Sequence, residues 1–351
     1  MAEDDAHFLT IIPAQSLPTV KDSAEAHPPT VADKIRAGCQ AWLAKSTSLD
    51  TRSNYKRDVQ QFLTFAGVAS DRPEAMADIG PTHVAAWRDS LKQAGLENAS
   101  IRRKMTALRS LFSYLQTYGA VAKNPAHGDF VDAPAVARDG KTVALSPKDC
   151  RRFLDAPSTT IAKPRNDGTS EEITLPTGVR DRALFAVLAY TGCRVGELTR
   201  LKVKSYKTTG VHRVLEIHGK GGKERLVPLH AEAAERIEAW LDVACLRDDS
   251  GGALFRPTKS ARGNGIDGFA ARPLTRRAVQ KQVEGYVFRL KLDPSVTVHS
   301  FRVTALTTAR EAGSDIIDLQ DFAGHADPRT TLTYIRSRDR LSKSPAYVLR
   351  Y

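Results

Sequence analysis

The stretch VHSFRVTALTTAREAGSDIIDLQDFAGHADPRTTLTYIR, residues 298–336, places two histidines, an arginine and a tyrosine at fixed spacings. His299 and Arg302 are three residues apart, so on a helix both side chains lie on one face and can converge on a single anionic oxygen. His325 comes 23 residues after Arg302, and Tyr334 nine residues after His325. The histidines and the arginine suit a phosphate, and a tyrosine so placed can be the nucleophile.

Two further motifs lie upstream. Residues 191–198 read T-G-C-R-V-G-E-L, and residues 219–225 read G-K-G-G-K-E-R between two alternating segments that predict a β-hairpin. Together with the stretch above, these motifs resemble the tyrosine recombinase (phage integrase) family, which carries T-G-x-R-x-x-E-L, G-K-G-x-K-x-R, H-x-x-R, G-H and a tyrosine in this order. The resemblance is to the simple two-domain Xer/Cre-like members. It covers residues 147–351 closely and the preceding helical region by pattern only.

The resemblance implies a mainly α fold with a small β-sheet, in which a helical, SAM-like core-binding bundle precedes an α+β catalytic domain. It also implies which residues are catalytic: Arg194, Lys220, His299, Arg302, His325 and the nucleophile Tyr334, with Glu197 in support. In the family the lysine protonates the departing 5′ oxygen. We expect His299 to accept the tyrosine proton and His325 to hydrogen-bond the phosphate, although the family permits some exchange of these duties. Taken alone, Arg194 and Glu197 also fit a simple ion pair, and Lys220 fits a solvated turn lysine.

Charge indicates a polyanionic partner. The length of 351 residues favours two domains, and the net charge is +12. The first 30 residues hold one lysine and five acidic residues, so the remainder carries +16. Such an excess suits double-stranded DNA, although a solvated basic surface would give the same total.

Cysteine spacing and hydropathy favour a cytoplasmic protein. The four cysteines, at 39, 150, 193 and 245, form no C-x-x-C pair, which favours reduced thiols over disulfides or a zinc ribbon. The longest apolar run, 183–190, is far shorter than the ~20 residues of a membrane-spanning helix, and the acidic N-terminus does not resemble a signal peptide. We expect neither a metal nor a cofactor, because H-E-x-x-H and Walker spacings do not occur in the sequence.

Periodicity predicts the order of the domains. Residues 1–29 predict a flexible acidic tail, and residues 30–128 show four helical segments that predict the small bundle, with aromatic and Met side chains in its core. Residues 129–146 predict a linker and residues 147–351 the catalytic domain, whose C-terminal tail is 337–351. Capping signals support these limits: Thr30 and Ser146 as N-caps, and Gly67, Gly95 and Gly119 as helix stops.

Basic residues on the expected helices, linker and hairpin are candidates for DNA contacts. A solvated helix face explains any one of these clusters equally simply, but the catalytic motifs favour phosphate contacts. The candidates are Arg52, Lys56, Arg57, Arg102, Arg103, Lys104, Arg109, Arg138, Lys141, Lys223, Arg225, Arg276, Arg277 and Lys281.

Three segments depart from the simplest pattern. Residues 157–178 predict a surface insertion of no assigned function. Phe301 replaces the leucine that is usual in the family and should still pack inward. The apolar and aromatic end, 344–351, either packs on its own domain or docks into a neighbouring subunit of a tetramer on two paired DNA sites, as in the family.

Three functions fit these motifs. The first is a site-specific DNA recombinase, for integration or excision of a mobile element or for dimer resolution. The second is a type IB topoisomerase, which shares the chemistry but acts alone. The third is a catalytically silent DNA-binding relative, which the presence of every catalytic position argues against.

Overall fold

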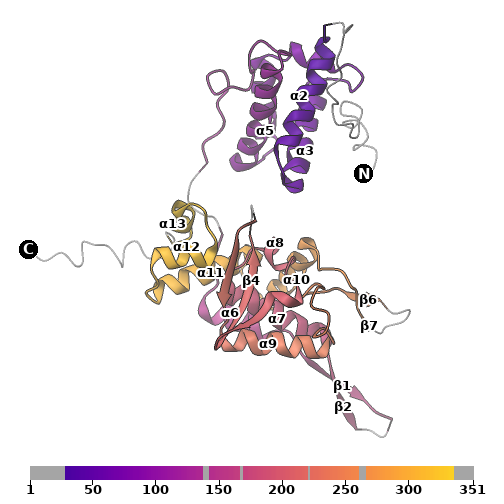
Figure 1. Ribbon diagram of the computed structural model, residues 1–351, viewed down its shortest axis with the longest axis vertical. Helices are drawn as coiled ribbons and strands as arrows, with labels where there is room; N and C mark the ends of the chain where they lie inside the picture. The colour runs from indigo at the N-terminus through magenta and orange to yellow at the C-terminus, as the bar shows by residue number, and fades with distance from the viewer. Residues whose placement is uncertain (1–27, 137–141, 167–168, 220–221, 261–265, 336–351) are drawn as a thin grey trace, which may run out of the picture. The chain divides into compact units, whose positions relative to one another are not determined.

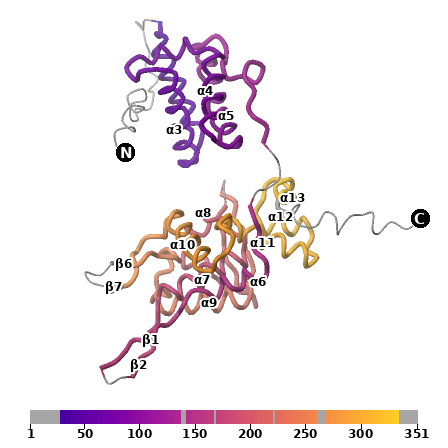
Figure 2. Tube along the Cα trace, turned by 180° about the vertical axis from the view of Figure 1, so that it is seen from behind, coloured from indigo at the N-terminus to yellow at the C-terminus, as the bar shows by residue number. Residues whose placement is uncertain are grey.

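The computed structural model describes residues 28–136, 142–166, 169–219, 222–260 and 266–335 (Figures 1 and 2). The chain divides into two compact units, residues 1–137 and 138–351, here called the N-terminal and C-terminal units. Several predictions fall outside the described residues: those for residues 1–27 of the acidic tail, for Arg138 and Lys141 of the linker, for Lys220, and for the tail 337–351.

The N-terminal unit is helical, as predicted. Its elements are α2 (Val31–Lys45), α3 (Leu49–Phe65), the 3-10 helix η1 (Pro73–Asp78), α4 (Pro81–Gln93) and α5 (Asn98–Thr117). Thr30 caps α2 through a capping box with Asp33, because its hydroxyl accepts from the Asp33 backbone and the Asp33 carboxylate accepts from the Thr30 backbone. Phe62 packs edge-on against Trp87 at 5.2 Å, and both side chains are buried. The prediction that aromatic residues form the core of the bundle is confirmed.

The C-terminal unit is built around α7 (Pro176–Thr191). Residues 183–188 of α7 are all fully buried, as expected of a helix that is apolar on every side. The helices α6 (Pro147–Asp155), α9 (Ala231–Val243) and α11 (Val298–Glu311) pack against it. Phe301 of α11 is fully buried and contacts Phe153 edge-on at 5.0 Å, so the prediction that it packs inward is confirmed.

An antiparallel sheet of β3 (Tyr206–Thr209), β4 (His212–His218) and β5 (Glu224–Pro228) covers part of this core. Its connection from α7 is α8 (Val195–Leu198) and the 3-10 helix η2 (Val203–Ser205). Leu215 and Val227 are paired across β4 and β5 and are both buried. The Gly219 backbone donates to Lys223 O at 2.7 Å and closes the predicted hairpin.

Two hairpins were not predicted from the sequence. In the predicted insertion 157–178, β1 (Thr160–Pro164) pairs with β2 (Ser170–Thr174) in an exposed ribbon that projects from the C-terminal unit (Figure 1). Further along, β6 (Thr258–Ser260) pairs with β7 (Ile266–Phe269). The remaining helices are α10 (Arg276–Arg289), α12 (Ile316–Ala323) and α13 (Pro328–Ile335). Across the residues that the structure describes, every helix is too short or too polar to cross a membrane.

Candidate active site

Gly192 ends α7 and begins the turn of the T-G-x-R motif. Its φ is +56°, in the left-handed region. A Cβ at this position would lie 3.4 Å from the Ala305 Cβ and from the Phe322 ring. Glycine therefore suits both the backbone conformation and the close approach of α11 and α12. The turn places Arg194 at the N-cap of α8.

Glu197 joins two arginines beneath this turn. Its Oε1 accepts from Arg194 Nη1 at 2.9 Å, and its Oε2 accepts from Arg225 Nη2 at 2.8 Å and from the Arg194 backbone at 3.0 Å. Burial alone would raise the pKa of Glu197, but the hydrogen bonds from Arg225 and Arg194 outweigh burial and lower it. The carboxylate is therefore charged at neutral pH and can orient the Arg194 guanidinium, whose side chain is 41% exposed.

Arg302 of α11 lies at the centre of the site and is 1% exposed. Its Nη1 donates to Gly192 O at 2.7 Å, and its Nη2 donates to Ala323 O at 2.6 Å. Its Nη2 is also 2.7 Å from Nε2 of His325. One guanidinium thus connects α11 to the turn after α7 and to the C-terminal end of α12.

His325 follows Gly324, whose left-handed φ of +62° ends α12. The His325 ring is buried, and its Nδ1 is 2.9 Å from the hydroxyl of Thr331 on α13. Burial, and next the positive charge of Arg302, lower the pKa of His325 to about 3. The ring is therefore neutral at neutral pH.

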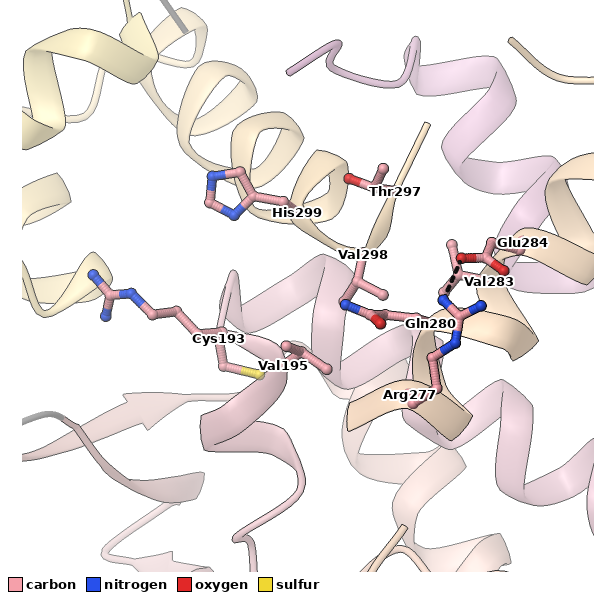
Figure 3. Close-up of a pocket in the computed structure, with 10 residues that line it drawn as sticks. Cys193, Val195, Arg277, Gln280, Val283, Glu284, Thr297, Val298 and His299 are labelled. Atoms are coloured by element: carbon pink, nitrogen blue, oxygen red, sulfur yellow. Dashed lines mark hydrogen bonds and ion pairs between the residues drawn. The ribbon is translucent and has the colours of Figure 1, made fainter. Parts of the chain in front are cut away.

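His299 stands three residues before Arg302 on α11 and borders an open pocket of about 540 Å³ (Figure 3). Cys193 and Arg194 border the pocket on the side of the T-G-x-R turn, and Arg277 borders it on α10. The His299 side chain is exposed, yet loss of hydration lowers its pKa, as do the charges of Arg302 and Arg194. Both histidines therefore lie within the electrostatic reach of the same two arginines.

The helix that carries Tyr334, α13, packs against α11 and α12. Its Tyr334 side chain lies outside the described part of the structure. Thr331, which is fully buried, precedes Tyr334 by one helical turn. The helix α13 thus lies beside His325 at Thr331.

The β4–β5 hairpin begins beside Glu197. A Cβ built on Gly219 would lie 3.9 Å from Glu197 Oε1. Lys220, the next residue, lies outside the described residues. The structure therefore describes the base of this hairpin and leaves the position of the lysine a prediction.

Family models match both units. Residues 147–340 match the Phage integrase family, and residues 40–119 match the Phage integrase, N-terminal SAM-like domain. A tyrosine recombinase XerC of Pelobacter propionicus is 30% identical over 306 residues, which cover 85% of this chain and 88% of the relative. The chain belongs to the phage integrase family of tyrosine recombinases. A tyrosine recombinase XerC of Salmonella typhi is also 30% identical to this recombinase, over 286 residues, which are 81% of this chain and 84% of the relative.

Solved structures share the fold of this recombinase. A structure of XerH site-specific recombinase bound to palindromic difH substrate matches 91% of this chain and 84% of the other, with a TM-score of 0.62 and 20% identity. A lambda integrase dimer bound to a COC′ core site matches 87% of this chain and 96% of the other, with a TM-score of 0.59 and 17% identity. The predicted fold class, a helical SAM-like domain followed by a recombinase catalytic domain, is confirmed.

Arg225 of the recombinase does not face solvent as a DNA contact would. Its side chain is 12% exposed, its Nε donates to Phe322 O at 3.1 Å, and its Nη2 bonds Glu197. A Cβ on Gly324 would meet Arg225 Nη1 at 2.8 Å, so the guanidinium lies directly against the turn before His325. The structure corrects the prediction: Arg225 supports the site from within.

Lys104 of the N-terminal unit also points inward. It is 6% exposed, and its Nζ donates to the fully buried Asp58 at 3.1 Å. The predicted DNA contact of Lys104 is therefore wrong, because its charge is neutralised inside the bundle. Arg103 pairs with the same carboxylate while staying partly exposed. Arg109 donates to the backbone oxygens of Ala126 and Val131, and these bonds hold the segment that follows α5 against that helix.

Other basic candidates lie at the surface or are partly exposed. Arg52 donates to Ser46 O and Arg57 donates to Asn54, so both have local partners. Arg276 lies against α8, since a Cβ on Gly196 would be 3.1 Å from its Nε. Most of the remaining candidates are exposed and two are half-buried: the exposed ones are Arg57, Arg102, Arg103, Lys223, Arg276, Arg277 and Lys281, and the half-buried ones are Arg52 and Lys56.

Proposed function

We propose that this recombinase cuts and rejoins DNA at specific sites through a 3′-phosphotyrosyl intermediate, with Tyr334 as the nucleophile. The observation that carries the proposal is the set of bonds made by Arg302. These bonds connect Gly192 of the T-G-x-R motif to His325 of the G-H motif. His325 in turn contacts Thr331, which lies on the same helix as Tyr334. Residues from motifs far apart in the sequence thus meet where a phosphate would have to bind.

Arg194 is the guanidinium best placed to bind the scissile phosphate. Its side chain is 41% exposed and its orientation is held by Glu197. Arg302 is buried, so it adds positive charge from beneath and orients the surrounding backbone. Two prearranged cations stabilise the charge that develops on the nonbridging oxygens in the transition state.

His299 is the proposed general base. A tyrosine of pKa ~10 would cost about 4 kcal/mol to ionise first at pH 7. The lowered pKa of His299 keeps its ring neutral and able to accept that proton. As the Tyr334 oxygen bonds to phosphorus, the bond to the 5′ oxygen breaks, and the proposed general acid Lys220 gives that oxygen a proton. Rejoining reverses these steps, and the covalent link conserves the phosphodiester energy.

The arrangement on DNA follows from the same proposal. We take residues 30–128 and 147–351 as the two DNA-binding domains, joined by the linker 129–146. The exposed basic residues would contact the DNA phosphates. The tail 337–351 would dock into a neighbouring subunit and form a tetramer on two paired sites. A recombinase of a mobile element or a chromosome acts where that DNA lies, and we take this place to be the cytoplasm.

Covalent capture tests this function. The protein and its Tyr334→Phe variant are incubated with fragmented genomic DNA of the source organism and denatured in detergent, and the attached DNA is sequenced. Inverted repeats around a short spacer, recovered with the wild type and lost with the variant, are expected. Scattered attachment would instead support the topoisomerase alternative, which the family relationship does not favour. No attachment with either protein would leave DNA binding without chemistry.

A further inference from the structure

The His325 ring is held on both edges. Its Nε2 is 2.7 Å from Arg302 Nη2, and its Nδ1 is 2.9 Å from Thr331 Oγ1. The ring is 6% exposed, and Thr331 is 0% exposed. The contact with Thr331 belongs to no motif recognised in the sequence.

The two partners together define the tautomer of the ring. A guanidinium has only donors, so Nε2 of His325 must accept from Arg302 and carries no hydrogen. A neutral imidazole then carries its hydrogen on Nδ1, which donates to the Thr331 hydroxyl. The lowered pKa of His325 supports the neutral ring.

We propose that Thr331 is a positioning residue for DNA cleavage: its hydroxyl fixes the Nδ1–H tautomer of His325, and His325 in turn fixes Arg302. The inference rests on the proposed function. It also makes His325 a ligand of Arg302 before DNA arrives, in addition to the phosphate contact expected from the family resemblance. Because Thr331 lies one turn before Tyr334, the same contact ties the nucleophile helix to the buried guanidinium.

A Thr331→Val substitution separates the role of the hydroxyl from that of the packing, because valine has nearly the shape of threonine but lacks the hydroxyl. The ring then has two choices. It can keep the hydrogen on Nδ1 with no acceptor in the place of Thr331, or it can move the hydrogen to Nε2, where it meets a donor of Arg302. The first choice removes the contact that holds the Nδ1 edge of the ring, and the second puts a hydrogen between His325 Nε2 and the Arg302 donor. Thr331→Ser retains the acceptor.

Two measurements on the full-length protein test the proposal. Long-range ¹H–¹⁵N spectra of histidine-labelled protein report which ring nitrogen of His325 carries the hydrogen, with assignment from a His325→Gln sample. The initial rate of covalent complex formation with pooled genomic fragments reports cleavage. Thr330→Val is the matched control, since Thr330 is the exposed neighbour on the same helix.

The wild type should show the hydrogen on Nδ1. Thr331→Val should either shift the Nδ1–H signal or move the hydrogen to Nε2. It should slow cleavage by about 10-fold to 100-fold, which is the range for removing a partner that orients a metal-binding histidine, applied here to a histidine that binds an arginine. Its DNA binding should be unchanged, and Thr331→Ser and Thr330→Val should behave like the wild type.

Two results would overturn the inference: a hydrogen on Nε2 in the wild type, or normal cleavage by a folded Thr331→Val protein. If Thr331→Val does not fold, the wild-type spectrum and the cleavage rate of Thr331→Ser decide the question. If the wild type forms no covalent complex, the proposed function fails, and the spectra of wild type and Thr331→Val still test the contact by themselves.

Discussion

The Nη1 of Arg302 donates to the carbonyl oxygen of Gly192 at 2.7 Å, across 110 residues of chain. The same guanidinium donates to Ala323 O at the end of α12. A side chain that is expected to act on a phosphate is thus also a structural connection between the motifs. Its removal should affect stability and chemistry together.

Arg302→Met tests this double role. Methionine fills similar space but cannot donate to Gly192 O and Ala323 O, so we expect the free energy of unfolding of the C-terminal unit to fall by about 3 kcal/mol. Hydrogen exchange of the α7 amides measures that change, and covalent capture should show no cleavage. The control is Arg310→Met, because Arg310 is an exposed arginine on the same helix. Equal stability of the two variants would contradict the prediction.

Gly192→Ala should reduce cleavage in addition to the stability that it loses through backbone strain. Gly210 has a similar φ of +59° but nothing within 4 Å of a built Cβ, so Gly210→Ala is the matched control. We expect each variant to lose about 1 kcal/mol of stability through the left-handed backbone. Only Gly192→Ala should also lose cleavage per folded molecule, because the strained backbone at this position carries the carbonyl oxygen that accepts from Arg302, and the added methyl group would contact Ala305 and Phe322. Equal cleavage by the two proteins would refute a special role for Gly192.

The stability of the C-terminal unit should depend on pH through His325. Its pKa falls from 6.5 to about 3 on folding, so the unfolded chain binds a proton that the folded chain does not. Stability is therefore complete above about pH 6.5 and decreases as the pH falls toward 3. Between pH 7 and pH 5 the wild type should lose about 1–2 kcal/mol that His325→Gln retains. Hydrogen exchange of the α7 amides measures the stability of both proteins. If the stabilities of the wild type and of His325→Gln change in parallel with pH, this assignment to His325 is contradicted.

Arg102 and Lys104 should behave differently although they are two residues apart on α5. Arg102 is exposed, so Arg102→Gln should weaken DNA binding and reduce the dependence of log K on log salt by about one. Lys104→Met removes the buried partner of Asp58 and leaves its pairing with Arg103, so it should cost about 1–3 kcal/mol of stability. Fluorescence anisotropy at several salt concentrations and thermal melting separate the two effects. A salt slope that changes with Lys104→Met in a folded protein would argue against its buried role.

The sequence contained more information about Lys104 than its charge suggested. Ile101, Lys104 and Leu108 follow helical spacing, which places the lysine on the apolar face of α5. Asp58 lies in the same way between Tyr55 and Phe62 of α3. Two opposite charges on facing apolar stripes indicate a buried pair.

The fold was otherwise well predicted, because helix caps, glycine stops and apolar periodicity are local signals. Arg225 and Thr331 show what local signals miss. Each has its function through partners that the fold brings close: Glu197 is 28 residues from Arg225, and His325 is six residues before Thr331 across the turn into α13. The β1–β2 hairpin was missed because its exposed strands lack an alternating apolar pattern.

The most direct test of the account is to identify the residue that becomes covalently attached to DNA. Captured complexes are digested with nuclease and protease, and the peptide that carries a nucleotide is sequenced by mass spectrometry. We predict a nucleotide joined through its 3′ phosphate to the Tyr334 oxygen, absent from Tyr334→Phe. An adduct on any other residue, or one through a 5′ phosphate, would contradict the assignment of nucleophile and polarity.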